Sequence, residues 1–423
     1  MPETMRAVDI KDGKGHADAL FINDSTPKPT AQSGEAIVKV KAFGLNRMDL
    51  LQREGLYPVP PQAPKTLGVE FSGTIESLGT DIKEDFSVGD EVFGLAYGGA
   101  YAEYLAVSTH MLLKKPDHLS WEEAAGIPET WITATQAMYL VGEFSQGKSI
   151  LWHAGASSVS IAGIQLAKNS GASAIYVTAG SQEKIDFCVS TLGATAGFNY
   201  KTQDWAKEIT TATDGKGVDI IVDFVGANYF QGDLDVAAKD ARVVLLGVMS
   251  GTKLPSGVDM GAFIFKRVRF EGSTLRSRDV DYQGKLRDKL EEYLPKFEDG
   301  TFKIFVDKVF PWEKVVEAHK EMEKNTKHTA HEGVAAEGTG KEGGCFMRRW
   351  GGGFRGRGRG NGGMWTEKEF PGGVEGEKTL GGVVETDDGV LVWSTSEQSH
   401  PFPRKIGSQS AKLRIGFVSA AQG

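Results

Sequence analysis

Residues 153–163 read HAGASSVSIAG, and this short stretch decides the fold. It follows an apolar run at 149–152 and leads into a helical pattern over 161–169, which is where a dinucleotide-binding loop would lie. Such a loop needs a tight turn, a close backbone approach and donors at a helix N-terminus. Gly155 can supply the turn, but Ser158 and Ser160 stand where glycines are expected. The loop alone therefore leaves two interpretations open, a phosphate loop or a packing turn of small residues.

The rhythm around the loop favours a nucleotide-binding domain. The stretches SILWHA, AIYVTA, AGFNY, GVDIIVDFV and ARVVLLGVM are apolar almost throughout, and short helical patterns separate them. Strands of this kind, alternating with helices, indicate a parallel sheet that is covered on both faces. We therefore predict an α/β fold with a doubly wound Rossmann domain over residues 126–264.

The flanking segments have a different character. Residues 1–125 contain alternating strands with frequent glycines, which is typical of a curved antiparallel sheet. Residues 265–326 mix strand and helix patterns. Residues 327–423 lose the apolar periodicity and include the tract GGGFRGRGRGNGG (351–363). We expect this last segment to be a disordered tail or misassigned coding sequence.

Composition narrows the functional classes. The chain of 423 residues has a formal net charge of −8, which argues against a chain-wide fit to nucleic acid. No apolar run approaches the roughly 18 residues of a membrane span, so we expect no membrane partner. Two cysteines cannot build a disulfide framework, and a reducing compartment such as the cytoplasm is the simplest setting.

Metal chemistry has little support in the sequence. The eight histidines form no recognisable ligand motif, and two cysteines cannot make a cysteine-built zinc site. Hydride transfer would then proceed without a zinc Lewis acid. This points to acceptors that are already electron-poor, such as quinones or conjugated carbonyls, whose reduced forms hydrogen bonds can stabilise.

The next strand bears on the choice of cofactor. AIYVTA ends in GSQEK (180–184), without the acid that usually binds the ribose 2′-hydroxyl of NAD. The Ser181 hydroxyl and the Lys184 ammonium instead suit a 2′-phosphate. Ser181 could also cap the following helix while Lys184 is solvated, and the two interpretations are compatible. The pair predicts NADPH rather than NADH.

Ordered blocks along residues 5–325 carry a family resemblance. They are GLNRMDLLQREGLYP (44–58), LGVEFSG (67–73), VGDEVFGL (88–95), GGAYAEY (98–104), IPETWITA (127–134), TAGSQEK (178–184), LGATAGFNY (192–200) and LRSRD (275–279). Together they resemble the zinc-independent quinone oxidoreductases of the medium-chain dehydrogenase/reductase superfamily, and most of all the p53-inducible quinone oxidoreductase group. The resemblance implies a GroES-like catalytic domain that is interrupted by the Rossmann domain and completed by residues 265–326, with the active site in the cleft between them.

The resemblance also implies catalytic residues. Zinc-dependent relatives carry a cysteine at the position of Asn46 and a histidine at that of Val69. In the zinc-free family the counterparts of Asn46 and Tyr57 lie near the nicotinamide and the substrate, and that of Thr133 contacts the nicotinamide side. Without the resemblance, Asn46 would read as a turn residue and Tyr57 as an aromatic packed on the prolines at 58–61.

The cofactor residues follow in the same way. The resemblance places one group at the pyrophosphate, one around the adenosine 2′-phosphate, one beside the nicotinamide half and one on the returning segment. The pyrophosphate group is Gly155, Ser158 and Val159, and the 2′-phosphate group is Gly180, Ser181, Lys184 and Tyr200. The nicotinamide group is Val225, Gly226, Gly247 and Met249, and the returning segment contributes Arg276 and Ser277.

These observations predict an NADPH-dependent reductase of quinones or other conjugated carbonyls. The alternatives are an enoyl or enone reductase of the same fold, and an NADPH-binding protein with little catalysis that acts through RNA or protein contacts. The resemblance further implies a homodimer formed through the edge strand RVRFEG (267–272). Family members end in a strand of the pattern N-x-G-K-I-V-L, but this chain reads KHTAHEGVAAEG from residue 327, so we expect the closing strand to be missing.

Overall fold

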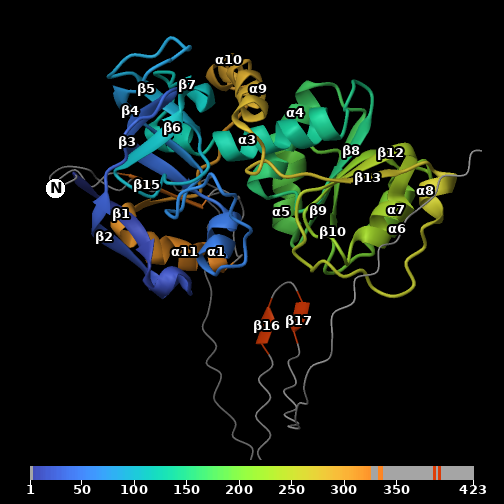
Figure 1. Cartoon of the computed structure of the whole chain (residues 1–423). Coiled ribbons are helices and arrows are strands. Elements are labelled where there is room, and N and C mark those ends of the chain that lie inside the picture. Colours follow the sequence, from blue (N-terminus) through green and yellow to red (C-terminus); the bar gives the residue numbers. More distant parts are fainter. Residues whose placement is uncertain (1–2, 325–331, 337–383, 387–388, 392–423) are drawn as a thin grey trace, which may run out of the picture. The chain divides into compact units, whose positions relative to one another are not determined.

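The computed structural model describes residues 3–324, 332–336, 384–386 and 389–391 (Figure 1). Residues up to 336 build two main sheets, one parallel and one mainly antiparallel. Strands β16 (Val384–Thr386) and β17 (Gly389–Leu391) form an antiparallel pair in a separate unit. The arginine–glycine tract at 351–363, with its RNA-binding alternative, lies outside the described residues.

The parallel sheet confirms the predicted Rossmann architecture. Its six strands lie in the order β10-β9-β8-β11-β12-β13, and every pair is parallel. The strands are β8 (Ser149–Trp152), β9 (Ala174–Ala179), β10 (Ala196–Asn199), β11 (Val218–Asp223), β12 (Ala237–Leu245) and β13 (Arg269–Gly272). The central strands β8 and β11 are buried along nearly their whole length, as a sheet covered on both faces requires.

One helix precedes the first of these strands, and the others connect them. They are α3 (Pro128–Thr135), α4 (Ser158–Asn169), α5 (Gln182–Asp186), α6 (Trp205–Ala212), α7 (Phe230–Val236) and α8 (Gly261–Phe265). π-helical turns extend α3 through Gln136–Val141 and α5 through Phe187–Leu192. Strand β13 carries the sheet beyond the predicted domain boundary at residue 264.

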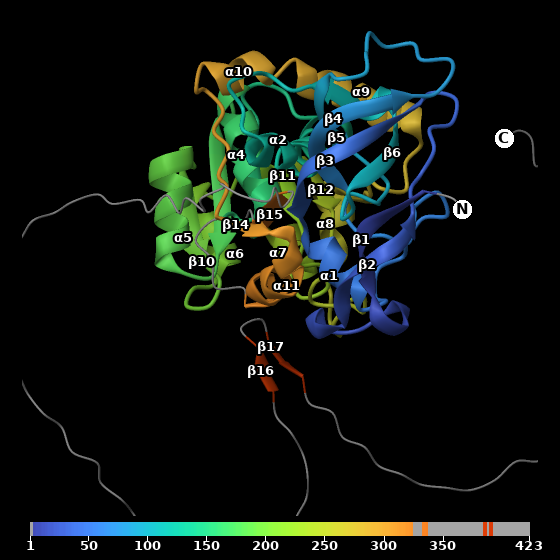
Figure 2. The same ribbon diagram turned by 90° about the vertical axis from the view of Figure 1, so that its left-hand side faces the viewer.

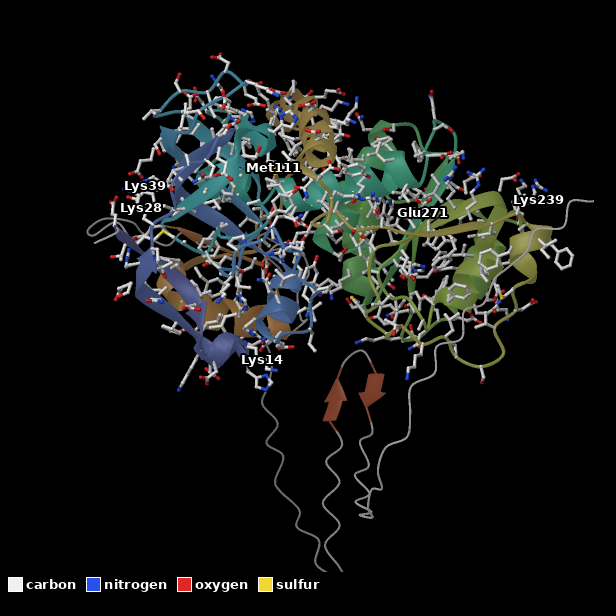
Figure 3. The ribbon with its side chains drawn as sticks, viewed as in Figure 1. Lys14, Lys28, Lys39, Met111, Lys239 and Glu271 are labelled. Atoms are coloured by element: carbon white, nitrogen blue, oxygen red, sulfur yellow. The ribbon has the colours of Figure 1, made fainter. Side chains whose placement is uncertain are left out.

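The antiparallel sheet has the order β14-β15-β3-β4-β5-β7, and β6 pairs with β3 beside this path. Its first strands are β3 (Glu35–Leu45), β4 (Glu70–Leu78), β5 (Glu91–Leu95), β6 (Tyr104–Ser108) and β7 (Leu112–Lys114). The hairpin of β1 (Thr4–Ile10) and β2 (Leu20–Pro27), together with α1 (Arg47–Arg53) and α2 (Trp121–Ala125), completes this part. Met111, labelled in Figure 3, belongs to the core inside this sheet.

The returning segment after β13 rejoins this antiparallel part. Helix α9 (Val280–Glu291) packs against α3, and α10 (Leu294–Glu298) follows it (Figure 1). Helix α11 (Val315–Glu323) packs against β2 and against β14 (Lys308–Pro311) (Figure 2).

Strand β15 (Glu332–Ala336) overturns one expectation. It lies between β14, to which it is parallel, and β3, to which it is antiparallel. The prediction that the sheet lacks a closing strand is therefore wrong in the structure. The sequence of this strand, EGVAA, differs from the family pattern, but backbone hydrogen bonds between strands do not depend on that pattern.

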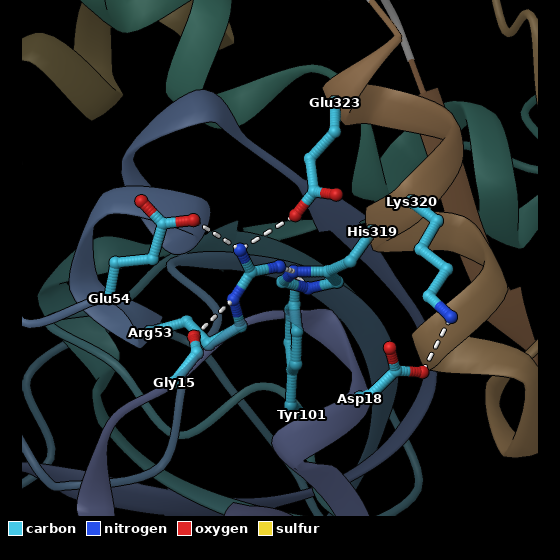
Figure 4. A network of polar contacts seen from close by, with 8 residues as sticks. All are labelled: Gly15, Asp18, Arg53, Glu54, Tyr101, His319, Lys320 and Glu323. Carbon is cyan, nitrogen blue, oxygen red and sulfur yellow. Dashed lines mark hydrogen bonds and ion pairs between the residues drawn. The ribbon is translucent and has the colours of Figure 1, made fainter. Parts of the chain in front are cut away.

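A buried arginine joins the returning segment to the N-terminal part (Figure 4). The side chain of Arg53 is fully buried, and its guanidinium contacts Glu54 at 2.6 Å, Glu323 at 2.7 Å and the His319 ring at 3.1 Å. The other ring nitrogen of His319 lies 3.3 Å from the Tyr101 hydroxyl. Burial, followed by the Arg53 charge, lowers the pKa of His319 to about 3, so its imidazole stays neutral.

Candidate active site

The two unexpected serines of the loop have different roles. Ser157 is the N-cap of α4, because its hydroxyl accepts the backbone N–H of Ser160 at 3.3 Å. The Ser160 hydroxyl is buried and donates to the carbonyl of His153 at 2.9 Å. The helix therefore begins at Ser158, earlier than the predicted residue 161. Ser160 closes the turn from inside, whereas Ser158 lies half-buried in the first helical turn.

The glycines of the loop satisfy packing. A Cβ on Gly155 would come within 2.6 Å of the Val177 Cβ on β9. A Cβ on Gly163 would lie 2.1 Å from the Trp152 ring, which is fully buried. Both interpretations of the loop are thus compatible: the glycines let the loop and helix approach the sheet, and the first turn of α4, with Ser158 and Val159, is left half-buried.

The residues predicted for the 2′-phosphate gather at the end of β9. Ser181 is the N-cap of α5, with its hydroxyl 3.4 Å from the backbone nitrogen of Lys184. The Tyr200 hydroxyl lies so near Gly180 that a Cβ there would be 2.8 Å away. All four residues are half-buried.

The turn after β11 brings together the next predicted group. The Asp223 carboxylate accepts the backbone N–H groups of Val225 at 2.6 Å and Gly226 at 2.9 Å. Gly226 has a φ of +84°, which favours glycine. A Cβ on Gly247 would meet the Phe224 carbonyl at 2.9 Å, so the segment after β12 lies directly against this turn.

Met249 follows on the same segment, and its side chain is exposed.

A chain of buried polar side chains runs beneath these strand ends. His153 contacts the Thr178 hydroxyl at 2.9 Å and Asp233 at 2.8 Å. Burial lowers the pKa of His153 to about 4, so the imidazole is neutral. Burial, with Asp233 as neighbour, raises the pKa of Asp223 to about 7, and burial raises that of Asp233 well above its usual range. Sequence reasoning missed this chain, because its members are distant in sequence.

Arg276 has hydrogen-bond partners in the N-terminal part of the chain. Its guanidinium donates to the carbonyl of Tyr97 at 2.6 Å and to Gln52 at 2.7 Å, so it ties the returning segment to the N-terminal part. The Arg276 side chain faces the Tyr57 ring at 5.5 Å. Ser277 is exposed, and its hydroxyl lies 2.5 Å from that of Thr274. These contacts associate Arg276 with the predicted catalytic residues.

Asn46 belongs to a hydrogen-bonded series of polar groups. It is the N-cap of α1, and its side-chain amide donates to Glu70 on β4 at 2.8 Å. The second oxygen of Glu70 accepts the backbone N–H of Glu129 at 2.9 Å. Glu129 lies one turn before Thr133 on α3, so the two side chains share a helix face. The series leads from Asn46 to Thr133 through two carboxyl-bearing residues.

Burial sets the protonation of these acids. Burial raises the pKa of Glu70 to about 8, and burial with Asp49 raises that of Glu129 to about 7. Asp49 accepts the backbone N–H of Asn46 at 2.8 Å, and burial raises its pKa to about 6. The cluster therefore holds protons at neutral pH.

The exposure of the cluster divides it into two layers. Asp49, Glu70 and Arg276 are buried, whereas a second set of residues is half-buried. That second set is Asn46, Tyr57, Glu129 and Thr133. The buried groups thus lie beneath a layer of half-buried residues.

Two polar atoms of this cluster are orphaned. Within the described residues, the Thr133 hydroxyl and the Nη2 atom of Arg276 are buried without a partner of good hydrogen-bond geometry. The hydroxyl nevertheless lies near enough to the Glu129 carboxyl to lower its pKa. Orphaned buried polar atoms carry a cost that a bound ligand can offset, so this surface fits a ligand with oxygen acceptors.

The three predicted catalytic residues are therefore brought into one cluster. Sequence reasoning missed Asp49, Glu70 and Glu129 as its acids. The only signal for Glu129 was its spacing of four residues before Thr133 in IPETWITA.

The cluster does not fit a zinc ion. The Asn46 amide nitrogen donates its hydrogen to Glu70, and Val69 offers no ligand atom. Over the described residues, no group of three His, Cys, Asp or Glu side chains is arranged to hold a metal.

Known families match both parts of the chain. Residues 32–117 match the alcohol dehydrogenase GroES-like domain, and residues 158–292 match the zinc-binding dehydrogenase family. A quinone oxidoreductase of Pseudomonas aeruginosa is 30% identical over 311 residues, which cover 73% of this chain and 93% of that protein. The chain belongs to the zinc-independent quinone oxidoreductase family. It is thus an oxidoreductase of the medium-chain dehydrogenase/reductase superfamily.

Another relative has a higher sequence identity to this chain, but less than half of its length aligns with it. The zebrafish (Danio rerio) synaptic vesicle membrane protein VAT-1 homolog is 36% identical over 226 residues, which are 53% of this chain and 46% of that protein.

Solved structures of similar proteins have the same fold. A quinone oxidoreductase of Pseudomonas syringae superposes with a TM-score of 0.68 at 28% identity, covering 79% of this chain and all of that one. The CurK enoyl reductase gives 0.68 at 26% identity, with the same coverage. A mycobacterial protein complexed with NADPH gives 0.67 at 26% identity, covering 79% of this chain and 99% of that one. These likenesses support a nicotinamide cofactor for this member.

No helix among the residues that the structure describes is both long and apolar enough to cross a membrane.

Proposed function

We propose that this family member is an NADPH-dependent reductase that transfers hydride, without zinc, to quinones or other conjugated carbonyls. The observation that carries the proposal is the two-layered polar cluster. Its half-buried residues, Asn46, Tyr57, Glu129 and Thr133, lie beside buried acids. Two buried donor atoms, the Thr133 hydroxyl and Arg276 Nη2, have no partner of good hydrogen-bond geometry among the described residues. Such preorganised donors suit a carbonyl oxygen that gains charge during reduction.

Each residue has a task in this proposal. The bound cofactor supplies the hydride. Glu70 accepts a hydrogen bond of 2.8 Å from the Asn46 amide. This bond fixes the amide and leaves its second N–H free to donate to a substrate oxygen. Arg276 places a positive charge beside Tyr57, where negative charge on the substrate would be stabilised. Thr133 offers a hydroxyl on the same helix face as Glu129.

NADPH is proposed over NADH because of the end of β9. Ser181 presents a hydroxyl at the N-terminus of α5, Lys184 follows in the first turn, and no acid stands at the strand tip. A hydroxyl and an ammonium suit a phosphate dianion, whereas an acid would repel it. The tight fit of Tyr200 on Gly180 supplies an aromatic wall beside these groups.

The direct test is steady-state oxidation of NADPH with ortho-quinones and with enones. We expect turnover with at least one acceptor class and a lower rate with NADH. Binding of NADPH without turnover of either class would refute the enzymatic proposal. Equal affinity for NADPH and NADH would refute the roles of Ser181 and Lys184 while leaving the reductase intact.

Enone reduction is a second candidate for the same site. The likeness to an enoyl reductase supports it, and so do acids that hold protons at neutral pH, because the enolate formed from an enone must be protonated. The ratio of kcat/KM for enones to that for quinones decides between the two.

We also propose a homodimer through β13. Within the described residues β13 pairs only with β12, so its outer edge offers backbone groups to a second copy. Arg269 and Glu271 flank Phe270, and both are exposed (Glu271 is labelled in Figure 3). Antiparallel pairing centred on Phe270 would place Arg269 of one copy opposite Glu271 of the other, which is favourable.

The dimer is tested by reversing charges. Glu271→Arg would place like charges opposite each other, and we expect sedimentation to show a shift towards monomer. The double change Arg269→Glu with Glu271→Arg restores opposite charges and should restore the dimer. A monomeric wild-type protein would refute the interface.

A cytoplasmic location is also part of the proposal. It rests on the low number of cysteines, two in the whole chain, which suits a reducing compartment.

A further inference from the structure

The proposed reaction needs a proton as well as a hydride. Reducing a conjugated carbonyl adds two electrons and one hydrogen with the hydride, and the resulting oxyanion or enolate must take up a proton. A positioned acid speeds this step most when its pKa lies near the working pH. The polar cluster contains three carboxyls, those of Asp49, Glu70 and Glu129, so the question is which of them can meet the substrate.

Exposure separates the three. Asp49 and Glu70 are each 0% exposed, so neither can touch a substrate. Both are also committed: Asp49 accepts the N–H groups of Asn46 and Gly68, and Glu70 accepts hydrogens from Asn46 and Glu129. Glu129 is the only one of the three that is half-buried as a residue rather than buried, so it is the acid that we expect to border the substrate.

The surroundings of Glu129 hold its carboxyl among the predicted catalytic residues. Its backbone is fixed by Glu70 at 2.9 Å, and the Thr133 hydroxyl lies beside its side chain on α3. The charges that face it are those of Asp49 on α1 and of Arg276 on the returning segment. The Glu129 charge also contributes to the raised pKa of the Tyr57 hydroxyl.

We propose that Glu129 is a catalytic acid, whose carboxyl donates its proton to the substrate as the carbonyl is reduced. The O–H bond of Glu129 breaks and a bond to hydrogen forms on the substrate oxyanion or enolate, while the hydride brings the two electrons. The carboxylate that remains is reprotonated by water. This inference rests on the proposed reductase function and adds the identity of its proton donor.

The balance of effects at Glu129 suits this task. Burial and the Asp49 charge raise its pKa, while Arg276 and Thr133 lower it, which brings it to about 7. A sealed acid such as Glu70, with a pKa of about 8, holds its proton but cannot pass it directly to a ligand.

The test is the variant Glu129→Gln, which keeps the shape but carries no acidic proton. We expect kcat with an enone to fall roughly 10²- to 10⁴-fold, the usual contribution of general acid catalysis. The wild-type rate should fall as pH rises through about 7, because the acid must be protonated, and this break should vanish in the variant. The Kd for NADPH, measured by fluorescence, should not change. Glu122→Gln, another half-buried carboxyl, on α2, is the matched control and should behave as wild type.

A second variant tests the proposal even if the first fails to fold, because it predicts the direction in which the pH profile moves. Thr133→Val removes a hydroxyl that lowers the pKa of Glu129, so the pH break should move to higher pH, which a purely structural role would not produce. A Glu129→Gln variant with the wild-type rate and pH break would overturn the proposal, as would a Thr133→Val profile without a shift. Absence of turnover in the wild type with every acceptor would instead refute the reductase function and the proposal with it.

Discussion

Replacing Glu70 with glutamine should change how stability depends on pH. Glu70 is 0% exposed, and its two oxygens accept from Asn46 and from the backbone of Glu129. Burial raises its pKa from 4.5 to about 8. Because the folded state holds the proton more tightly than the unfolded chain, the stability that this group contributes is complete below pH 4.5 and is lost as pH rises to 8.

The magnitude follows from the size of the shift. One pKa unit corresponds to about 1.4 kcal/mol, so ionising the buried Glu70 costs at most about 5 kcal/mol by pH 8. Glutamine cannot ionise, but its amide leaves one of the two donors without an acceptor, at a cost of about 1–3 kcal/mol at every pH. Glu70→Gln should therefore be less stable than wild type near pH 5, and this deficit should shrink or reverse by pH 8.

Urea unfolding at pH 5, 6, 7 and 8 measures this crossing. Asp49 and Glu129 also have raised pKa values, so the wild-type stability should fall with pH, and the slope of Glu70→Gln should be shallower by about 1.4 kcal/mol per pH unit. Glu76→Gln, at an exposed position on the same strand, is the control and should keep the wild-type slope. Equal slopes for Glu70→Gln and wild type would refute the buried, protonated state of Glu70.

Two further predictions concern the Rossmann part. Gly163→Ala places a Cβ 2.1 Å from the buried Trp152 ring, so we expect a loss of about 1–3 kcal/mol in thermal unfolding. Gly272→Ala, where a Cβ meets nothing within 4 Å, is its control, and equal losses would contradict the packing role. Replacing Ser181 and Lys184 together by alanine removes charge-assisted donors that contribute about 1.5–3 kcal/mol each. We therefore expect NADPH affinity, measured by fluorescence titration, to fall at least 10-fold while NADH affinity stays constant. An equal loss of affinity for both nucleotides would contradict the assignment.

Much of the fold could be predicted because its signals are local. The apolar strands and the helices between them each depend on a few neighbouring residues. The start of α4 was placed too late, because the capping role of Ser157 was not recognised. The strand at 332–336 was missed because it lacks the family pattern, while its pairing with β3 and β14 comes from distant segments.

The candidate site was predictable only in part. The resemblance led to Asn46, Tyr57 and Thr133, and the structure brings them into one cluster. The resemblance could not reveal that Glu70 joins Asn46 to Glu129, because these contacts span 24 and 59 residues of sequence. Protonation was equally hidden, since the pKa of a carboxyl depends on its burial and on its neighbours in space.

Buried carboxyl groups show where this chain gives up stability. Their raised pKa values mean that water would solvate them better than the protein does, and a fold selected only for packing would carry apolar residues instead. Among the described residues, buried carboxyl groups with raised pKa values occur in two places: beneath the strand ends predicted to bind the cofactor, around Asp223 and Asp233, and in the cluster of Asp49, Glu70 and Glu129. Because both places coincide with residues predicted from the loop and the family blocks, the cost in stability is best explained by function. The serines of the loop fit this view: Ser160 closes the turn from within, while Ser158 is left half-buried in the first turn of α4, where a phosphate could be bound.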